Sequence, residues 1–246
     1  MSEALYPESI GPERPADPSP ARRKRGILRT TVAVLLSLFL IPHLYLLALK
    51  LVPTLPTVTM MQRALSGEDV RREWARIEDI SPHLVHAVIG AEDSRFCEHS
   101  GIDWEATREQ LDAPGGPSRG ASTVTQQTAK NVFLWNGGGY PRKAAEAWFA
   151  LVGDAVWGKR RTLEIYLNVA EWGDGLFGAE AAAQTRFGKP ASELTPREAA
   201  LLAAVLPSPN RWRVDPPGPY VSKRAGTLQA RARVVEGEGL AGCVLD

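Results

Sequence analysis

SPHLVHAVIGAEDSRFCEHSG, residues 81–101, combines a helix start signal with a dense group of charged side chains. The Ser-Pro pair that opens it is typical of an N-cap followed by the first helical position. Apolar residues then recur at spacings of three and four, as on one face of a helix, and Glu92 falls in that face between Ile89 and Phe96. The stretch therefore predicts an amphipathic helix with a carboxylate on its buried side.

A carboxylate in this position has an expected chemistry. Apolar neighbours reduce the hydration of its charged form, so we expect the pKa of Glu92 to be raised toward the range of a general base at neutral pH. The alternative is an ion pair with Arg95, because ion pairs also perturb carboxylates. Asp93 projects about 100° away around the helix and is expected to be structural.

A second stretch of interest is GASTVTQQTAKN, residues 120–131. Thr123 with Gln126 three residues later predicts a capping box at the start of a helix. The free N–H groups there, the positive end of the helix dipole and Lys130 together suit a phosphate group. A plain capped helix is the alternative. The Pro/Gly-rich residues 111–120 just before it are expected to form a flexible loop.

Two further stretches place charges on predicted helices. Arg142 and Lys143 open one helix, where positive side chains oppose the helix dipole unless an external anion compensates; a solvated face is the default interpretation. KRRTLEIYLNVAEWG, residues 159–173, predicts another helix. Glu164 lies beside its buried stripe and is spaced to pair with Arg160.

Composition narrows the function classes. The 246 residues are 44% hydrophobic and 23% charged, which is ordinary for a globular protein. A net charge of +1 gives no support to a nucleic-acid partner, which would require a basic face. Cys97 and Cys243 match no metal-ligand spacing. They could form one disulfide, but we expect two unrelated thiols.

The N-terminal region predicts a membrane anchor. Arginine and lysine residues precede VAVLLSLFLIPHLYLLAL, residues 32–49, an uncharged run long enough to cross a bilayer as a helix. This charge bias predicts a cytoplasmic N-terminus and an exported remainder. A cleaved signal peptide is the alternative, but the run is longer than a usual signal and no clean cleavage site follows.

Four stretches, in this order, resemble the motifs of the biosynthetic peptidoglycan glycosyltransferases in their short monofunctional form. EDSRFCEHSG is similar to E-D-x-x-F-x-x-H-x-G, and GASTVTQQTAKN is similar to G-x-S-T-x-x-Q-Q-x-x-K-N. RKAAE is similar to R-K-x-x-E, and KRRTLEIYLNVAEWG is similar to K-x-x-x-L-E-x-Y-L-N-x-x-x-x-G. The resemblance runs from about residue 54 to about residue 235.

The resemblance implies a mainly α, lysozyme-like glycosyltransferase domain preceded by one transmembrane helix. We expect a disordered cytoplasmic tail at 1–27, the transmembrane helix at 28–52, the catalytic domain at 53–237 and a C-terminal tail at 238–246. The implied location is the cytoplasmic (inner) membrane, crossed once, with the catalytic domain outside the cytoplasm. No transpeptidase activity is expected, because no S-x-x-K, S-x-N and K-T-G set follows.

The implied activity is polymerisation of lipid II into linear glycan strands by inverting transfer, with release of undecaprenyl pyrophosphate, in bacterial cell-wall biogenesis and the maintenance of cell shape. Glu92 aligns with the base that deprotonates the acceptor 4-hydroxyl, and Glu164 with a second glutamate on the donor side. Lys130, Arg142 and Lys143 align with groups that hold the pyrophosphate. The full set of expected substrate-binding residues is Ser122, Thr123, Gln126, Gln127, Lys130, Asn131, Arg142 and Lys143.

The expected partners are lipid II, the growing glycan strand, the membrane, and cell-wall synthase or divisome proteins, with no nucleic acid. A divalent cation, magnesium or manganese, is expected to assist, with no organic cofactor and no metal site made by the protein. Gly138 stands where many relatives carry a basic residue, which removes one pyrophosphate contact or shifts its role to Arg142.

Two other functions remain open on the sequence. A membrane-anchored lytic glycosidase must protonate a poor leaving oxygen and can do without cations. A transferase that expels pyrophosphate needs positive charge where negative charge develops, so the cations beside the carboxylates favour it. An inactive lipid II-binding scaffold is supported only by Gly138.

Overall fold

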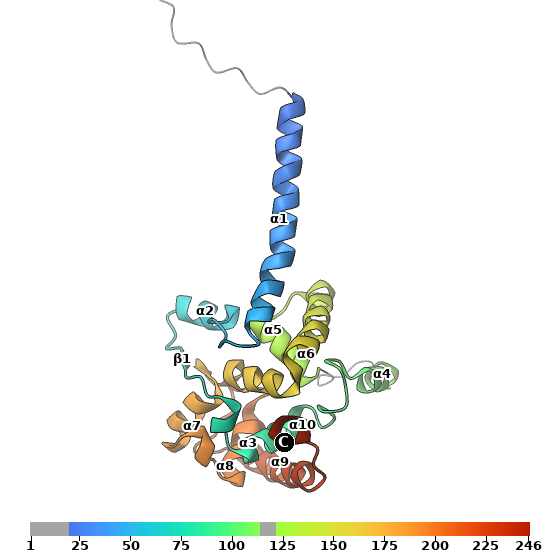
Figure 1. Cartoon of the computed structure of the whole chain (residues 1–246). Coiled ribbons are helices and arrows are strands. Elements are labelled where there is room, and N and C mark those ends of the chain that lie inside the picture. The colour runs from blue at the N-terminus through green and yellow to red at the C-terminus, as the bar shows by residue number, and fades with distance from the viewer. Residues whose placement is uncertain (1–19, 114–121) are drawn as a thin grey trace, which may run out of the picture. The chain divides into compact units, whose positions relative to one another are not determined.

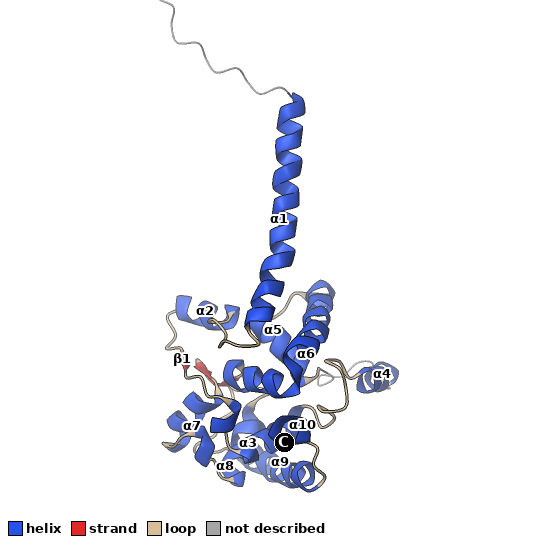
Figure 2. Ribbon diagram, in the orientation of Figure 1, coloured by secondary structure: helices blue, strands red, loops and turns tan. Residues whose placement is uncertain are grey.

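The computed structural model describes residues 20–113 and 122–246. The chain divides into two compact units, Met1–Leu44 and Tyr45–Asp246, which are described separately. The part that the structure describes is mainly helical, as predicted (Figure 2). The tail expected at residues 1–19 and most of the flexible loop expected at 111–120 lie outside the described residues.

The first unit contributes most of one long helix, α1 (Pro20–Ala48). Its segment Ile27–Ala48 has 22 residues, and the most apolar 18-residue window in it has a mean hydropathy of 2.1 and is only 6% buried. At about 1.5 Å per residue this segment is long enough to cross a hydrocarbon core of ~30 Å. The helix ends at Ala48, earlier than the expected limit of the membrane span at residue 52.

The second unit begins at Tyr45, before the domain boundary expected at residue 53. Leu46 and Leu49 are 1% and 0% exposed because they pack in a small apolar cluster that includes Trp157 and Ile165. The last turn of α1 is therefore part of the folded unit that follows it.

The elements of the second unit are mostly short helices connected by brief loops (Figure 1). In chain order after α1 they are α2 (Val58–Leu65), β1 (Arg71–Arg72), η1 (Ile77–Asp79), α3 (Pro82–Glu92), α4 (Trp104–Asp112), α5 (Val124–Phe133), α6 (Gly139–Val169), β2 (Glu171–Gly173), β3 (Leu176–Phe177), α7 (Ala179–Phe187), η2 (Ala191–Glu193), α8 (Pro196–Val205), α9 (Pro219–Gly237) and α10 (Gly242–Leu245). The strands form one small sheet in the order β1-β3-β2, with β1 parallel and β2 antiparallel to β3.

The main core surrounds α3, which packs against both α8 and α9, while α5 packs along α6. The side chains of α8 from Ala199 to Val205 are all buried, because small alanine residues allow close helix approach. This packing holds the C-terminal end of α3, where Glu92 lies, beside the start of α5.

Local signals in the sequence predicted several helix starts correctly. The hydroxyl of Ser81 accepts a hydrogen bond from the His83 amide, and Thr123 forms the expected capping box with Gln126 at the start of α5. The helix predicted over residues 159–173 is shorter, because it ends at Val169 and the chain then enters β2. Gly158, with a φ of 71°, divides α6 into two helical parts.

Two predictions about the C-terminal end are wrong. Residues 238–246 are no free tail, since they include α10 and bury the side chain of Val244. Cys97 and Cys243 are joined by a disulfide, with their Cα atoms 5.7 Å apart. The packing of α9 on α3 returns the chain to the loop after α3, so residues separated by 146 positions meet.

Candidate active site

Glu92 is the last residue of α3 and is partly buried. Its Oε2 accepts a hydrogen bond from Nε2 of Gln127 on α5, at 3.0 Å. Burial raises the pKa of Glu92, while the Gln127 hydrogen bond and the positive charges of Arg224 and Lys130 oppose that rise. The alternative of an ion pair with Arg95 is wrong, because that guanidinium binds other carboxylates.

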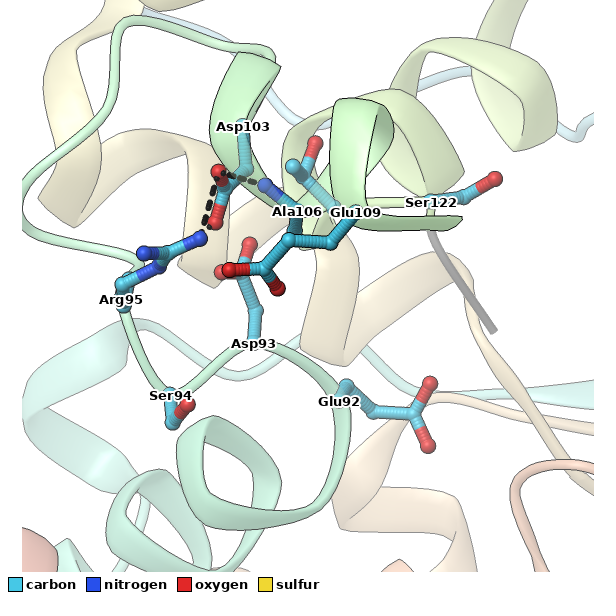
Figure 3. Close-up of a pocket in the computed structure, with 9 residues that line it drawn as sticks. Glu92, Asp93, Ser94, Arg95, Asp103, Ala106, Glu109 and Ser122 are labelled. Carbon is cyan, nitrogen blue, oxygen red and sulfur yellow. Dashed lines mark hydrogen bonds and ion pairs between the residues drawn. The ribbon is translucent and has the colours of Figure 1, made fainter. Parts of the chain in front are cut away.

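The first hollow of the site lies at the end of α3 (Figure 3). It has a volume of about 350 Å³, and its lining includes Glu92, Ser122 and Thr123. In Figure 3 the carboxylate of Glu92 is directed away from the group formed by Arg95 and Asp103, which bind each other at 2.9 Å. Glu92 is thus separate from the salt bridges that shape the opposite wall.

Asp93 has the structural role expected for it. Its Oδ2 accepts a hydrogen bond from the Val124 amide at 2.9 Å, and its Oδ1 is 3.0 Å from Nε2 of His99. The Val124 amide is one of the N–H groups that the start of α5 leaves without a helical partner. Asp93 therefore holds the start of α5 in place, and with it the Gln127 side chain that reaches Glu92.

A second hollow is lined by Gln127, the residue that donates a hydrogen bond to Glu92 in the lining of the first. Its volume is about 310 Å³, and its lining includes Gln127, Lys130, Asn131 and Tyr166. The Tyr166 hydroxyl lies 3.5 Å from Oε1 of Gln127, so both ends of the amide are occupied. This arrangement fixes the orientation of Gln127 toward Glu92.

Three cations gather around a buried glutamate, Glu146, which is 2% exposed. One of its oxygens accepts a hydrogen bond from Arg142 at 2.5 Å, and the other accepts one from Lys143. Lys143 also donates to the hydroxyl of Ser122 at 2.7 Å, which connects this group to the first hollow. The arrangement places two positive side chains on a single buried carboxylate.

Lys130 is the third cation and lines the second hollow. Burial lowers its pKa, and the positive charges of Arg142 and Lys143 lower it further, whereas Glu146 and Glu92 oppose this. No residue in the described ranges forms a hydrogen bond or ion pair with its Nζ atom. An ammonium group that is desolvated in this way would gain from an incoming anion.

Gly138 has a structural reason to replace a basic residue. Its φ is 90°, a conformation that side chains other than glycine rarely adopt. A Cβ atom there would lie 3.1 Å from Cβ of Arg142 and 3.2 Å from Nε1 of Trp135. The space of a side chain at position 138 is therefore taken by Arg142 and Trp135.

The other expected site residues fall into two groups. Thr123 and Gln126 are buried and form the cap of α5, with the Thr123 hydroxyl donating to the Gly101 carbonyl at 2.7 Å. Ser122, Gln127 and Asn131 line the hollows.

Glu164 is not brought to either of these hollows. It lines a third one of about 470 Å³, accepts a hydrogen bond from the Ile77 amide at 3.0 Å, and pairs with Arg161. The expected pair with Arg160 is wrong, because that side chain binds Glu78 and the Val244 carbonyl.

Two residues of the site were missed in the sequence. Glu146 was present in the quoted stretch RKAAE but was assigned no role. Arg224 on α9 lies beyond the four motifs, acts electrostatically on Glu92, and has a buried Nε without a hydrogen-bond partner in the part of the chain described. No local pattern in the sequence marks Arg224.

The described residues also offer no set of metal ligands. Within residues 20–113 and 122–246, no three histidine, cysteine, aspartate or glutamate side chains are placed to hold an ion together. Asp93 and Asp103, which line the first hollow, are already bound to histidine, arginine or backbone amides.

Comparison with known proteins identifies the family of this chain. A family model described as transglycosylase matches residues 58–235. A biosynthetic peptidoglycan transglycosylase of Rhodospirillum centenum is 50% identical over 224 residues, which cover 89% of this chain and 96% of that protein. Proteins of the same name from Caulobacter vibrioides and Xanthomonas campestris are 43% identical over 226 residues and 44% over 229, covering 89% of this chain and 99% and 93% of those proteins. The resemblance and the expected lysozyme-like helical fold are thereby confirmed, and the chain belongs to the transglycosylase family.

Proposed function

We propose that this protein polymerises lipid II into linear peptidoglycan strands by inverting glycosyl transfer, with release of undecaprenyl pyrophosphate. The observation that carries the proposal is the partly buried Glu92 beside cations that are organised on Glu146. A glycosidase would need a general acid but no such group of cations. Expulsion of pyrophosphate does need positive charge at the leaving group.

In the proposed reaction Glu92 takes the proton of the acceptor 4-hydroxyl. The acceptor oxygen then forms a bond to C1 of the donor sugar, and the bond between C1 and the pyrophosphate oxygen breaks. The raised pKa of Glu92 supports this role, because a stronger base accepts a proton more readily near neutral pH. Gln127 keeps the carboxylate in a fixed orientation while the acceptor approaches.

The pyrophosphate that leaves is proposed to bind Lys130, Arg142 and Lys143. Positive groups that are already in place stabilise developing negative charge without reorganisation. Ser122, which accepts a hydrogen bond from Lys143, and Asn131 complete the polar surface on which the substrate would lie.

Glu146 takes the place that the sequence had suggested for Glu164. It holds Arg142 and Lys143 together and also acts on Lys130. Both oxygens of Glu164 are instead occupied in a separate hollow. Arg224 is added to the proposal as a charge that acts on the base.

A divalent cation, magnesium or manganese, is proposed only as a companion of the phosphates of the substrate. The described side chains do not fit a metal site of their own. Every step above is assigned to residues of this chain and none depends on the ion.

The proposed location is the inner membrane, with the N-terminus in the cytoplasm and the catalytic unit outside. The apolar helix and the preceding basic residues support this orientation. The disulfide between Cys97 and Cys243 supports it independently, because disulfides persist mainly in oxidising compartments. Cell-wall synthase or divisome partners stay a prediction.

The experiment that tests the proposal is a product analysis with purified full-length protein. We expect labelled lipid II to yield long glycan and undecaprenyl pyrophosphate, with the configuration at the new linkage inverted relative to the donor. Finished cell wall, offered in parallel, should stay intact. Soluble wall fragments would favour the lytic glycosidase, and lipid II binding without turnover would favour the scaffold.

A further inference from the structure

The segment in which the chain leaves the apolar helix, residues 45–55, is here called the anchor exit, and it belongs to the second unit. Nε1 of Trp157 donates to the Leu46 carbonyl at 2.8 Å, and Nε of Arg161 donates to the Leu49 carbonyl at the same distance. The last carbonyls of a helix have no partner within the helix. Trp157 therefore satisfies a carbonyl in the last turn of α1, and Arg161 binds the carbonyl of the residue that follows the helix.

Arg161 uses its whole guanidinium in this contact. One terminal nitrogen donates to the Val52 carbonyl and the other to Glu164. Its plane lies over the ring of Trp74 at 5.3 Å, and Arg72 lies against the same ring at 5.4 Å. Each of the three guanidinium nitrogens is thus bonded, and the side chain acts as a clamp on the anchor exit.

Arg72 binds the anchor exit at a later residue, Thr54. It donates to the Thr54 carbonyl at 2.8 Å and also binds the hydroxyl of the same residue. The Leu55 amide donates to the hydroxyl of Tyr45 at 2.8 Å, so the first and last residues of the anchor exit are hydrogen-bonded to each other. The exit is thus part of the packed structure and not a free linker.

Glu164 is the carboxylate that orients the clamp. It is 7% exposed, one oxygen binds Arg161, and the other accepts from the Ile77 amide at 3.0 Å. Arg161 is only partly buried, and the ion pair with the buried carboxylate of Glu164 orients its guanidinium. Each of its two oxygens thus has a partner within the protein, away from the hollows that Glu92 and Lys130 line.

We propose that Glu164 is a positioning residue that holds Arg161 on the anchor exit, and that this hold is needed specifically for turnover of a membrane-embedded substrate. The proposal rests on the proposed function, since it assumes a lipid-linked donor. The reacting groups of such a donor lie at a fixed depth in the bilayer surface, so a loosened exit lowers the fraction of productive encounters. A substrate that is free in water can approach the hollows in any orientation of the protein and does not need the hold.

The test compares two substrates on one preparation of full-length protein in lipid vesicles. One substrate is lipid II with its natural long chain in the same vesicles, and the other is a water-soluble analogue with a short prenyl chain. For Glu164→Gln we expect kcat/KM to fall about tenfold on the embedded substrate, and to change less than about twofold on the soluble one. The matched control is Glu78→Gln, an exposed glutamate bound to Arg160, which should change neither rate.

A second variant keeps the test decisive if Glu164→Gln folds poorly. Trp157→Phe removes only the N–H donor to the Leu46 carbonyl and keeps an aromatic ring in the core. It should show the same preference for the soluble substrate, with a smaller loss. Melting temperatures establish that each variant is folded.

Three results would overturn the proposal. Equal loss on both substrates in a folded Glu164→Gln protein would place Glu164 in the chemistry itself. Unchanged rates on both substrates in Glu164→Gln and Trp157→Phe would show that the hold has no role in turnover. A wild-type protein inactive on both substrates would refute the proposed function, and this inference would fall with it.

Discussion

Two buried glutamates of α6, Glu146 and Glu164, have the same local setting and different surroundings. Each accepts a hydrogen bond from an arginine about one helical turn earlier, Arg142 in one case and Arg161 in the other. Around Glu146 two cations share one carboxylate, and Lys130 nearby has no bonded partner among the described residues. Around Glu164 one arginine meets one carboxylate, and the other two nitrogens of that arginine donate to backbone carbonyls.

An arginine–glutamate ion pair on a helix therefore does not by itself determine what the glutamate does. The cations on Glu146 lie beside the hollow that Glu92 lines and can receive an anion there, whereas Glu164 and backbone carbonyls direct Arg161 to the anchor exit. The two ion pairs have nearly equal spacing in the sequence, so only the residues packed around them in the folded protein distinguish them. The predictions below test this contrast.

The largest effect is expected from removing the charge of Glu146. In Glu146→Gln the side chain keeps its size but no longer attracts Arg142 and Lys143, so both cations lose their fixed positions. We expect kcat to fall about 10²–10³-fold on embedded and soluble substrates alike, which is the usual cost of losing preorganised charge. The measurement is the rate of glycan formation with each substrate. A loss of rate on the embedded substrate alone would show that Glu146 acts as Glu164 is proposed to act, and would contradict this prediction.

A loss of about 10²-fold is expected from Lys130→Met, which removes the charge beside the second hollow. Lys130→Arg keeps that charge and should recover part of the rate. Glycan formation at saturating substrate separates the two variants. Equal activity in Lys130→Met and wild type would remove Lys130 from the proposed leaving-group site.

A smaller effect on turnover is expected from breaking the disulfide. Cys97→Ser with Cys243→Ser opens a covalent link across 146 residues, and the free energy of unfolding should fall by about 2–5 kcal/mol. The contacts of Asp93 that hold α5 do not involve sulfur, so glycan formation below the melting temperature should fall less than about tenfold. Chemical denaturation and rate assays on the same protein check both parts. An inactive but folded double variant would show that the link itself positions Glu92.

The smallest effect is a displacement of the pH profile. Glu92 acts when it is deprotonated, and burial raises its pKa above the ordinary 4.5, so activity should be lost on acidification at a higher pH than for an exposed glutamate. Lys130 acts when it is protonated, and its lowered pKa moves the alkaline loss below the ordinary 10.5. The dependence of kcat/KM on pH reports both groups. Lys130→Arg should move only the alkaline limb upward; a moved acidic limb would contradict the assignment.

Local features of the fold and site could be predicted from the sequence. The cap at Ser81, the capping box at Thr123 and the buried side of the helix that carries Glu92 depend on residues a few positions apart. The ordered motifs were sufficient to identify the family, and the resemblance, not the charge spacing, implied that Lys130, Arg142 and Lys143 belong to the site. Such features are determined within one helix or one loop.

The features that could not be predicted depend on residues that are distant in the chain. The role of Glu164 follows from Ile77 and from the anchor exit, more than one hundred residues before Arg161. Arg160 and Arg161 are equally plausible partners by spacing, and only the positions of Glu78 and Val244 decide between them. The disulfide and the influence of Arg224 on Glu92 are likewise products of the packing of α9 on α3.

The most direct test of the central claim is the rate at which full-length protein in vesicles polymerises labelled lipid II, wild type against Glu92→Gln. The account predicts long glycan from wild type, and a loss of about 10²–10⁴-fold in the variant, which is the usual contribution of a general base. The variant should keep its melting temperature and its binding of lipid II. A folded Glu92→Gln protein that polymerises at the wild-type rate would contradict the assignment of the base.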